Sequence, residues 1–340
     1  MTNDELRFRR LSGQYLLARD DAHTVIRNLC GIQSQFLSNA FHALRIRSTS
    51  FDCARPEGIL KSWTLRGTMH LFEAHDLPLM FHQGRVRKLR PCDTLDADEW
   101  ISAERKRLFA EMILNSVRAG TDEREALKKI CIEAGMTETE AQSIFNPWGG
   151  TIRALCEAGK LTHAVSEKKA FIPCDSFEPM EKEAAELELA RRYFTHYGPA
   201  TIHDAAYFFG SPQSYVKKWL NCLPVLSTQC DGRTYYYIEE NPEHKEIPAC
   251  LFLAGFDPLM LGYEKTENPF LPKEHLRAVF SLAGIVNPAL LINGQTAGKW
   301  KRTGKRIDVT MFETLTPAMR DRIAQTAEQL WPDMKAVRFL

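Results

Sequence analysis

The sequence predicts an α+β fold in which groups of helices are followed by short β-hairpins. Apolar residues recur at helical spacing through the first part of the chain, and glycines and prolines separate the periodic segments. Short apolar and aromatic runs joined by polar turns follow two groups of three helices. From about Ile247 on, the sequence pattern changes from that of helices to that of short strands. Three helices followed by a hairpin are the order of a winged helix. This order is clear in the two later groups of helices and less clear in the first hundred residues.

Four helices and one strand are expected in the first hundred residues. An apolar face marks a helix over about 5–19, and Asp20-Asp21 begins a second helix. Ser38 is expected to cap a third helix. A proline at a first-turn position starts a fourth helix over 56–65. A glycine then ends this helix, and residues 68–73 have the pattern of a short strand.

Two later groups of helices carry clear start and stop signals. Thr137 and Glu140 form a capping-box sequence, and Asp231-Gly232 is a hairpin turn signal. The expected helices cover residues 101–119, 122–134, 137–157 with an interruption, 181–197, 201–209 and 212–220. The expected strands cover residues 160–164, 169–172, 225–227 and 235–238.

The C-terminal part is expected to be a small β-rich module with a closing helix. Asn293-Gly294 is a strong signal for a two-residue hairpin loop. The expected strands cover residues 249–254, 277–282, 289–292, 296–300 and 307–312, and the helix covers 317–330. The predicted division is a first winged-helix unit with the candidate loop over 1–98, a second unit over 99–175, a third over 176–245, and the module over 246–340.

The composition is that of an ordinary globular protein. Of the 340 residues, 44% are hydrophobic and 26% charged, and 44 Lys and Arg stand against 43 Asp and Glu, a formal net charge of +1. A chain coated uniformly with positive charge is excluded, so contact with nucleic acid must depend on local basic patches. The N-terminus has no apolar signal core, and no apolar run reaches the ~18 residues of a membrane span. A cytoplasmic protein without membrane contact is expected.

The cysteine pattern and the motif content exclude several chemistries. The nine cysteines are scattered, and no pair has the C-x-x-C spacing of a zinc or redox site, so free thiols and no metal are expected. The chain has no Walker loop, G-x-G-x-x-G, H-E-x-x-H or G-x-S-x-G sequence. These absences exclude three classes of protein: a nucleotide-driven motor, a metalloprotease and a serine hydrolase. Neither a nucleotide nor another cofactor is expected.

Two glutamines, Gln33 and Gln35, are the first candidates for chemistry. They lie one residue apart just after an apolar helical run, in a loop without an acidic residue that could act as a base. About thirty residues later, Trp63 and Arg66 precede a glycine turn and a predicted strand that carries His70. Spacing alone favours a structural interpretation, in which the glutamines cap helix ends or face solvent.

Five sequence blocks, taken in order, favour a functional interpretation of the glutamines over the structural one. The blocks are Gly31 to Gln35, Trp63 to Leu71, Tyr193 to Thr201, Phe256 to Tyr263, and Asn293-Gly294 with Gly298 to Trp300. Together they resemble the winged-helix DNA-binding family whose characterised members are DNA glycosylases of the AlkZ type, which unhook interstrand crosslinks. The resemblance covers nearly the whole chain and implies three tandem winged helices forming a C-shaped basic channel, with a β-rich C-terminal part. It also implies that Gln33 and Gln35 are catalytic.

The implied chemistry suits neutral side chains. Alkylation at guanine N7 puts a positive charge on the base, which becomes a good leaving group without protonation. Two tasks remain, to place a water at the sugar C1′ and to stabilise an oxocarbenium-like transition state. Neutral amide oxygens can perform both by orientation and dipole, and general-base assistance would be modest.

Arg66 and His70 are secondary candidates with structural alternatives. Arg66 could bind a phosphate next to the lesion, and a surface salt bridge is the alternative. His70 could hydrogen-bond a glutamine or the water, but it alternates with Met69 and Leu71, so a buried structural histidine is the simpler interpretation.

Two basic clusters are candidates for DNA contact. In each, positive charges are interleaved with apolar or aromatic residues, a composition that suits phosphate contacts whose strength falls steeply with salt. A solvated charged face is the alternative for both. The candidate residues are Arg85, Arg87, Lys88 and Arg90 in the first cluster and Lys301, Arg302, Lys305 and Arg306 in the second.

The sequence therefore predicts a monofunctional DNA N-glycosylase. Its expected substrate is double-stranded DNA with cationic N7-alkylated purines, with interstrand crosslinks as a further substrate class. A crosslink spanning both strands could hardly enter a closed pocket, so an open, surface-like site is expected. The alternative is a non-catalytic winged-helix DNA-binding regulator, which would be indifferent to Gln33→Ala.

Overall fold

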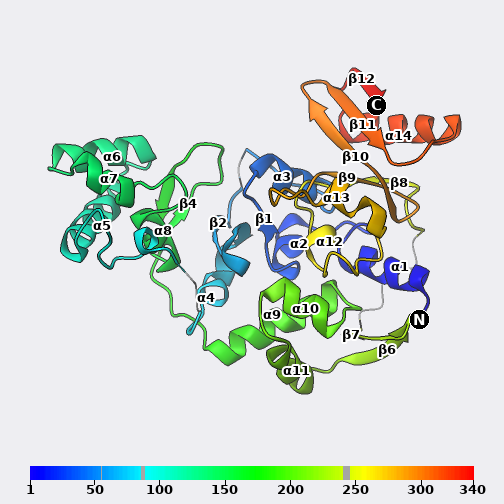
Figure 1. Cartoon of the computed structure of the whole chain (residues 1–340), viewed down its shortest axis with the longest axis horizontal. Helices are drawn as coiled ribbons and strands as arrows, with labels where there is room; N and C mark the ends of the chain where they lie inside the picture. The colour runs from blue at the N-terminus through cyan, green and yellow to red at the C-terminus, as the bar shows by residue number, and fades with distance from the viewer. Residues whose placement is uncertain (55, 86–88, 240–245) are drawn as a thin grey trace. The chain divides into compact units, whose positions relative to one another are not determined.

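The computed structural model describes residues 1–54, 56–85, 89–239 and 246–340 (Figure 1). The chain divides into two compact units. Unit 1 is built from the two ends of the chain, Met1–Arg55 and Glu186–Leu340, and unit 2 is the continuous segment Pro56–Ala185 between them. Both helices and strands contribute to each unit, so the predicted α+β class is confirmed. The winged-helix assignment and the four-part division stay predictions.

The helical part of unit 1 brings together segments from both ends of the chain. Helix α1 packs its buried Leu6 and Leu11 inward, and Thr201 and Asp204 form a capping box that begins α10. Asp231 and Gly232 have φ angles of 46° and 71°, as a two-residue hairpin turn requires. The elements are α1 (Asn3–Gly13), α2 (Ala22–Asn28), β1 (Ile32–Gln33), α3 (Leu37–Arg45), α9 (Lys182–His196, in unit 1 from Glu186 on), α10 (Ile202–Phe209), α11 (Gln213–Cys222), β6 (Leu226–Cys230) and β7 (Arg233–Tyr237).

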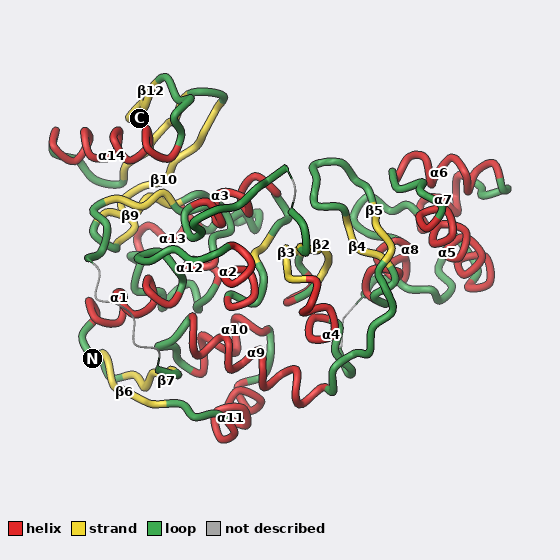
Figure 2. The backbone as a smooth tube through the Cα atoms, turned by 180° about the vertical axis from the view of Figure 1, so that it is seen from behind, coloured by secondary structure: helices red, strands yellow, loops and turns green. Residues whose placement is uncertain are grey.

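The C-terminal part of unit 1 is a sheet with a helix packed on it. Within the described residues the strand order is β12-β11-β10-β9-β8, with β11 and β12 parallel and the other pairs antiparallel. Figure 2 shows α14 beside β10 and β12, and Ile323 and Ala327 of this helix join Trp300 and Trp331 in one apolar core. The elements are β8 (Cys250–Phe252), α12 (Pro258–Leu261), η4 (Lys273–His275), α13 (Leu276–Val279), β9 (Ala289–Ile292), β10 (Gln295–Thr303), β11 (Arg306–Met311), α14 (Pro317–Leu330) and β12 (Ala336–Phe339).

Unit 2 has a core of its own, built mainly from helices. Phe109, Ile113 and Leu127 are buried there with Phe171 of the hairpin, and the capping box of Thr137 and Glu140 is confirmed. The elements are β2 (Ile59–Trp63), η1 (Leu65–Gly67), β3 (Met69–Glu73), η2 (Ala74–Asp76), α4 (Leu77–Met80), η3 (Pro91–Asp93), α5 (Ala103–Arg118), α6 (Arg124–Glu133), α7 (Glu138–Ile144), α8 (Thr151–Glu157), β4 (Leu161–His163) and β5 (Phe171–Pro173).

Four local predictions are wrong, each for a physical reason. Residues 56–65 contain strand β2 instead of a helix, because β2 pairs along its length with β3, and long-range pairing overrides a weak local preference. Residues 277–282 fall in α13 and a turn instead of a strand, since short apolar runs fit either structure. The first helix ends at Gly13, before Tyr15 adopts a φ of 60°. Helix α3 begins after Phe36 without a side-chain cap, so Ser38 is not its N-cap.

Candidate active site

The glutamine loop is the segment from Cys30 to Phe36, and a helix-ending motif fixes its entry. The amide of Gly31 donates to Ile26 O at 2.8 Å and the amide of Cys30 donates to Arg27 O at 3.1 Å, the two bonds of a Schellman motif. Cys30 and Gly31 have φ angles of 57° and 91°. These positive values turn the chain sharply out of α2, so that β1 begins at once.

The two glutamines differ in exposure. Gln33 ends β1 and is 9% exposed, whereas Gln35 lies in the following bend and is exposed. Within the part of the chain that the structure describes, neither side-chain amide forms a hydrogen bond to a protein group. Both amides are therefore available to a water or a substrate, one from a mostly covered position and the other from the surface.

An aromatic stack supports the end of the glutamine loop. The Phe36 ring, which directly follows Gln35, lies 5.7 Å from the Phe256 ring with an interplanar angle of 25°. Next to it, a Cβ on Gly255 would lie 2.7 Å from Nδ2 of Asn39 in α3. A Cβ here would have to displace the Asn39 amide, so the glycine lets the segment before Phe256 lie close to the beginning of α3 without moving that side chain.

A buried ion pair fixes the segment that carries Phe256. Asp257 and Arg47 are both 0% exposed, and Arg47 Nη1 and Nη2 donate to the two carboxylate oxygens at 3.0 and 2.5 Å. The same carboxylate accepts from the amides of Ala254 and Leu259. Every carboxylate oxygen thus has two donors, which offsets the cost of burying the charge. Asp257 is a structural turn residue, as its position before a proline suggests.

Tyrosines from α9 and from the segment after α12 support the other side of the loop. The Tyr197 hydroxyl donates to Leu29 O at 3.0 Å, one residue before Cys30. Tyr263 donates to Tyr197 O at 3.0 Å, and Tyr193 donates to Gly262 O at 2.8 Å. Complete burial raises the pKa of Tyr193 well above its usual value, so the hydroxyl keeps its donor proton.

His70 and Arg66 lie in unit 2, on β3 and in the turn before it. The His70 ring is buried, and its Nδ1 is 3.0 Å from Thr68 O, so Nδ1 carries the hydrogen of that bond and the ring is held by its own strand. Arg66 has a φ of 54°, an unusual value for a residue with a side chain. Arg66 is partly exposed in this turn.

Unit 2 contains the first basic cluster, where two arginines are engaged by the protein. The Arg85 side chain is 10% exposed, ion-paired with Glu157, and donates to the carbonyls of Trp63 and Met80. Arg90 binds both oxygens of Asp93 at 2.7 and 2.9 Å. These contacts favour a structural role for both. Arg87 and Lys88 lie outside the described residues.

The second basic cluster lies on the hairpin of β10 and β11. Arg302 donates to Asp333, and Arg306 donates to Asp308 at 2.9 Å. Lys301 and Lys305 are exposed at the same end of this hairpin. The two lysines remain the better candidates for phosphate contacts in this cluster.

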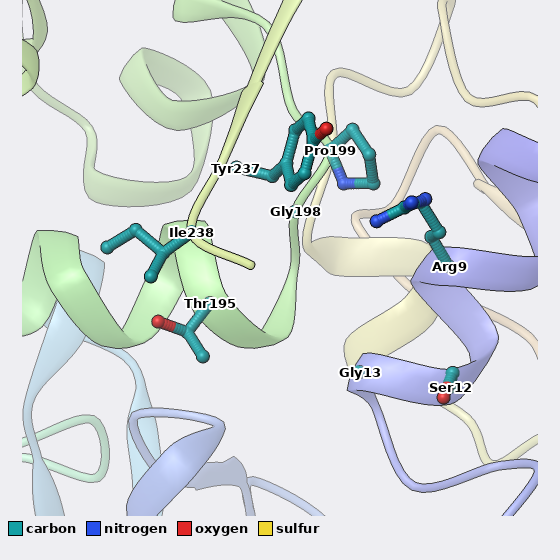
Figure 3. A pocket seen from close by; sticks show the side chains of 8 residues that line it. All are labelled: Arg9, Ser12, Gly13, Thr195, Gly198, Pro199, Tyr237 and Ile238. Atoms are coloured by element: carbon teal, nitrogen blue, oxygen red, sulfur yellow. The ribbon is translucent and has the colours of Figure 1, made fainter. Parts of the chain in front are cut away.

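A small pocket in unit 1 is not a site for a nucleobase. Figure 3 shows it between α1, the Gly198-Pro199 turn and the end of β7, lined among others by Arg9 and Tyr237. Its volume is about 50 Å³, room for one or two waters. The pocket is a seam between packed elements.

Three further findings bear on the predicted chemistry. Within the described ranges, no group of three or more His, Cys, Asp or Glu is arranged to hold a metal ion. All nine cysteines are free thiols, and Cys222 is exposed. None of the described helices has the length and apolar character to cross a membrane.

The sequence singled out the glutamine pair but did not show which residues support it. Tyr197, Tyr263, Phe256 and Asp257 all lie in the sequence blocks that carried the resemblance, so the signal was present as order and spacing. Arg47 lies outside those blocks. A buried arginine in an amphipathic helix end cannot be distinguished by sequence from an exposed one.

Comparison with known proteins identifies the class. A family model described as DNA glycosylase AlkZ-like matches residues 26–331, a range that includes the glutamine loop and all the elements that support it. The protein is a DNA glycosylase. More narrowly, the chain belongs to the AlkZ-like family of these enzymes.

Two matches from Streptomyces sahachiroi, one in sequence and one in structure, illustrate the similarity. An interstrand DNA cross-link repair glycosylase is 26% identical over 340 residues, covering 89% of this chain and 88% of the relative. The solved structure of the DNA glycosylase AlkZ matches with a TM-score of 0.75 and 21% identity, covering 100% of both chains. At this identity, the structural match shows that the two chains have the same fold.

Proposed function

We propose that the protein hydrolyses the N-glycosidic bond of cationic N7-alkylated purines in double-stranded DNA, with Gln33 and Gln35 positioning the attacking water. The observation that carries the proposal is the glutamine loop itself. Two neutral amides without protein partners lie on a backbone fixed by α2, α9 and the Phe256–Asp257 segment. A rigid loop with unused hydrogen-bonding groups is the arrangement that preorganised catalysis requires.

The reaction balances without a general acid. Water oxygen forms a bond to C1′ while the bond from C1′ to N9 breaks, and the electron pair of that bond neutralises the positive charge of the alkylated ring. The proton released by the water passes to solvent. Gln33, the less exposed amide, is suited to orient the water, and the oxygen of Gln35 is suited to stabilise positive charge that develops on the sugar.

Interstrand crosslinks joined through N7 of a purine are included in the proposal. The similar Streptomyces sahachiroi protein is named for interstrand cross-link repair, and a bulky lesion suits a glutamine placed at the surface, as Gln35 is. Because no lysine is invoked, the product is an intact abasic strand. Lys301 and Lys305 are proposed phosphate contacts. Arg66 is a proposed phosphate contact beside the lesion, and His70 a proposed partner of the water.

The test is base release from a duplex carrying a single N7-methylguanine. We expect the double variant Gln33→Ala/Gln35→Ala to lose about 10²-fold or more in single-turnover rate, the scale typical of a lost proton-transfer or water-positioning group. Gln325→Ala, an exposed amide of α14, is the matched control and should keep the full rate. The product should stay uncleaved until alkali is added.

Each remaining outcome has a defined meaning. Salt-sensitive DNA binding without release from either the methylated or a crosslinked duplex would contradict the proposal and favour the non-catalytic DNA-binding alternative. Strand cleavage without alkali would contradict the monofunctional assignment. Unchanged release by a folded double variant would remove the glutamines from the mechanism.

A further inference from the structure

One tight turn of unit 1 carries the most exposed large apolar side chain in the described part of the chain. Leu282, at the tip of the turn over residues 281–285, is 88% exposed, and Ile285 beside it is also exposed. Single apolar residues on a surface are common and need no explanation. The construction and the position of this turn distinguish it from such cases.

The turn is rigid. The amide of Ser281 donates to Ile285 O at 2.9 Å, the amide of Ile285 donates to the Ser281 hydroxyl at 3.0 Å, and Gly284 donates back to Ser281 O at 3.2 Å. Below it, Phe280 pairs with Val286 in an antiparallel bridge. The side chain of Leu282 is therefore presented to solvent by a fixed backbone, which lowers the entropy lost on contact.

The base of the turn is attached to the support of the glutamine loop. Val286 O accepts from the amide of Phe256 at 3.1 Å, and the Phe256 ring stacks on Phe36, the residue after Gln35. Leu282 is four residues from Val286, so it lies no more than about 13 Å away along an extended strand. This reach corresponds to roughly three to four base-pair steps of a duplex.

The chain that leads into the turn carries exposed charge. Lys273 and Arg277 are exposed on η4 and α13, with Glu274 between them. Two cations before an apolar tip match the surface of a duplex, in which phosphates flank a stack of apolar bases. Proteins that bind in the minor groove use leucine in this way, as a wedge between base steps.

We propose that Leu282 inserts into the base stack of duplex DNA beside the nucleotide whose glycosidic bond is broken. This inference rests on the proposed function and adds a specificity element to it. Unstacking a neighbouring step opens the sugar edge of the reacting nucleotide, so that the water held by the glutamines reaches C1′ without a closed pocket. The turn thereby selects duplex over single-stranded substrate.

The experiment places 2-aminopurine next to the reacting position of a duplex and measures its fluorescence, which rises when the base unstacks. At saturating protein we expect a several-fold rise with the unaltered chain and with Leu282→Met, and no rise with Leu282→Ser. Leu340→Ser is the matched control, because Leu340 is a 62% exposed leucine of the same unit. Base release from N7-methylguanine should fall about tenfold in the Leu282→Ser duplex reaction and stay unchanged on a single strand.

The fluorescence readout is independent of glycosylase chemistry. Equal fluorescence rises for Leu282→Ser and the unaltered chain would overturn the wedge and leave the glycosylase proposal intact. A rise that depends on Leu282 without any base release would support the wedge and contradict the proposed reaction. Lack of duplex binding by the unaltered chain would overturn both, and would leave Leu282 as a contact for another protein.

Discussion

The side chains that matter most are defined by their surroundings more than by their type. Gln33 and Gln35 are identical in chemistry and one residue apart, yet the turn at Cys30 and Gly31 leaves one mostly covered and the other exposed. Their different environments are a reason to expect different roles in the reaction. The sequence contains the pair but not this difference, because burial is set by residues distant along the chain.

Substitution of Asp257 by Asn should show what the buried ion pair contributes. The change leaves the Arg47 charge buried without its partner, so we expect the free energy of unfolding to fall by about 3–5 kcal/mol. Asp333→Asn is the control, because its bond to Arg302 is solvent-exposed and should contribute about 0–1 kcal/mol. Urea unfolding of both variants measures the difference, and similar losses would contradict this account.

At the scale of elements, α2, β1, α3, α9 and α12 form one supporting assembly in unit 1. The close approach of α9 to α12 depends on Gly262, where a Cβ would lie 2.4 Å from Cδ1 of Tyr197 and 2.9 Å from Pro258 O. Tyr197 is buried and donates to Leu29 O, so its ring cannot move away without disturbing the end of α2. A side chain at position 262 would therefore strain the support of the glutamine loop.

Gly262→Ala should consequently lower both stability and activity. Overpacking of this kind costs about 1–3 kcal/mol, and the displaced Tyr197 should slow base release more than the loss of stability alone explains. A double-mutant cycle with Tyr197→Leu is the measurement, since removal of the ring relieves its part of the clash and leaves only the contact with Pro258 O. We expect the two stability changes to be clearly non-additive; simple additivity would show that the contact is absent.

Elements with local signals were predictable, and those that depend on distant partners were not. Helix α14 and strand β9 have the predicted bounds, because periodicity and a turn signal at Asn293-Gly294 act within a few residues. Strand β2 was mistaken for a helix because its partner is β3, and β12 was missed because it pairs in parallel with β11. For the candidate site, the sequence pointed to the glutamines, which stay a prediction, but the support by Phe256, Asp257 and Tyr197 needed the fold.

At the scale of the whole molecule, buried histidines link stability to pH. Burial lowers the pKa of His42 to about 4, of His196 to about 4 and of His163 to about 3, from ordinary values near 6.5. Between the ordinary pKa near 6.5 and the lowered values, these histidines are therefore protonated in the unfolded chain but neutral in the folded chain. The stabilisation that results from these low pKa values is fully present above about pH 6.5, and it is lost as the pH decreases toward 4.

His42→Gln should flatten this dependence. One histidine with such a shift accounts for roughly 3 kcal/mol between pH 7 and pH 4. His42 packs between Trp300 and Trp331, so the fluorescence of these tryptophans in urea titrations at pH 7, 6, 5 and 4.5 is a suitable probe. The exposed His23 provides the control His23→Gln. A variant as sensitive to acid as the unaltered chain would show that other groups dominate.

The construction of unit 1 from both ends of the chain has a consequence for protein synthesis. Arg47 leaves the ribosome 210 residues before Asp257, whereas unit 2 is continuous and its core needs no later residues. Because domains fold as they emerge, unit 2 can fold on a nascent chain before Phe256 and Tyr263, which support the glutamine loop, have been synthesised. The proposed catalytic loop can therefore be completed only late in translation, after the C-terminal part of unit 1 has emerged.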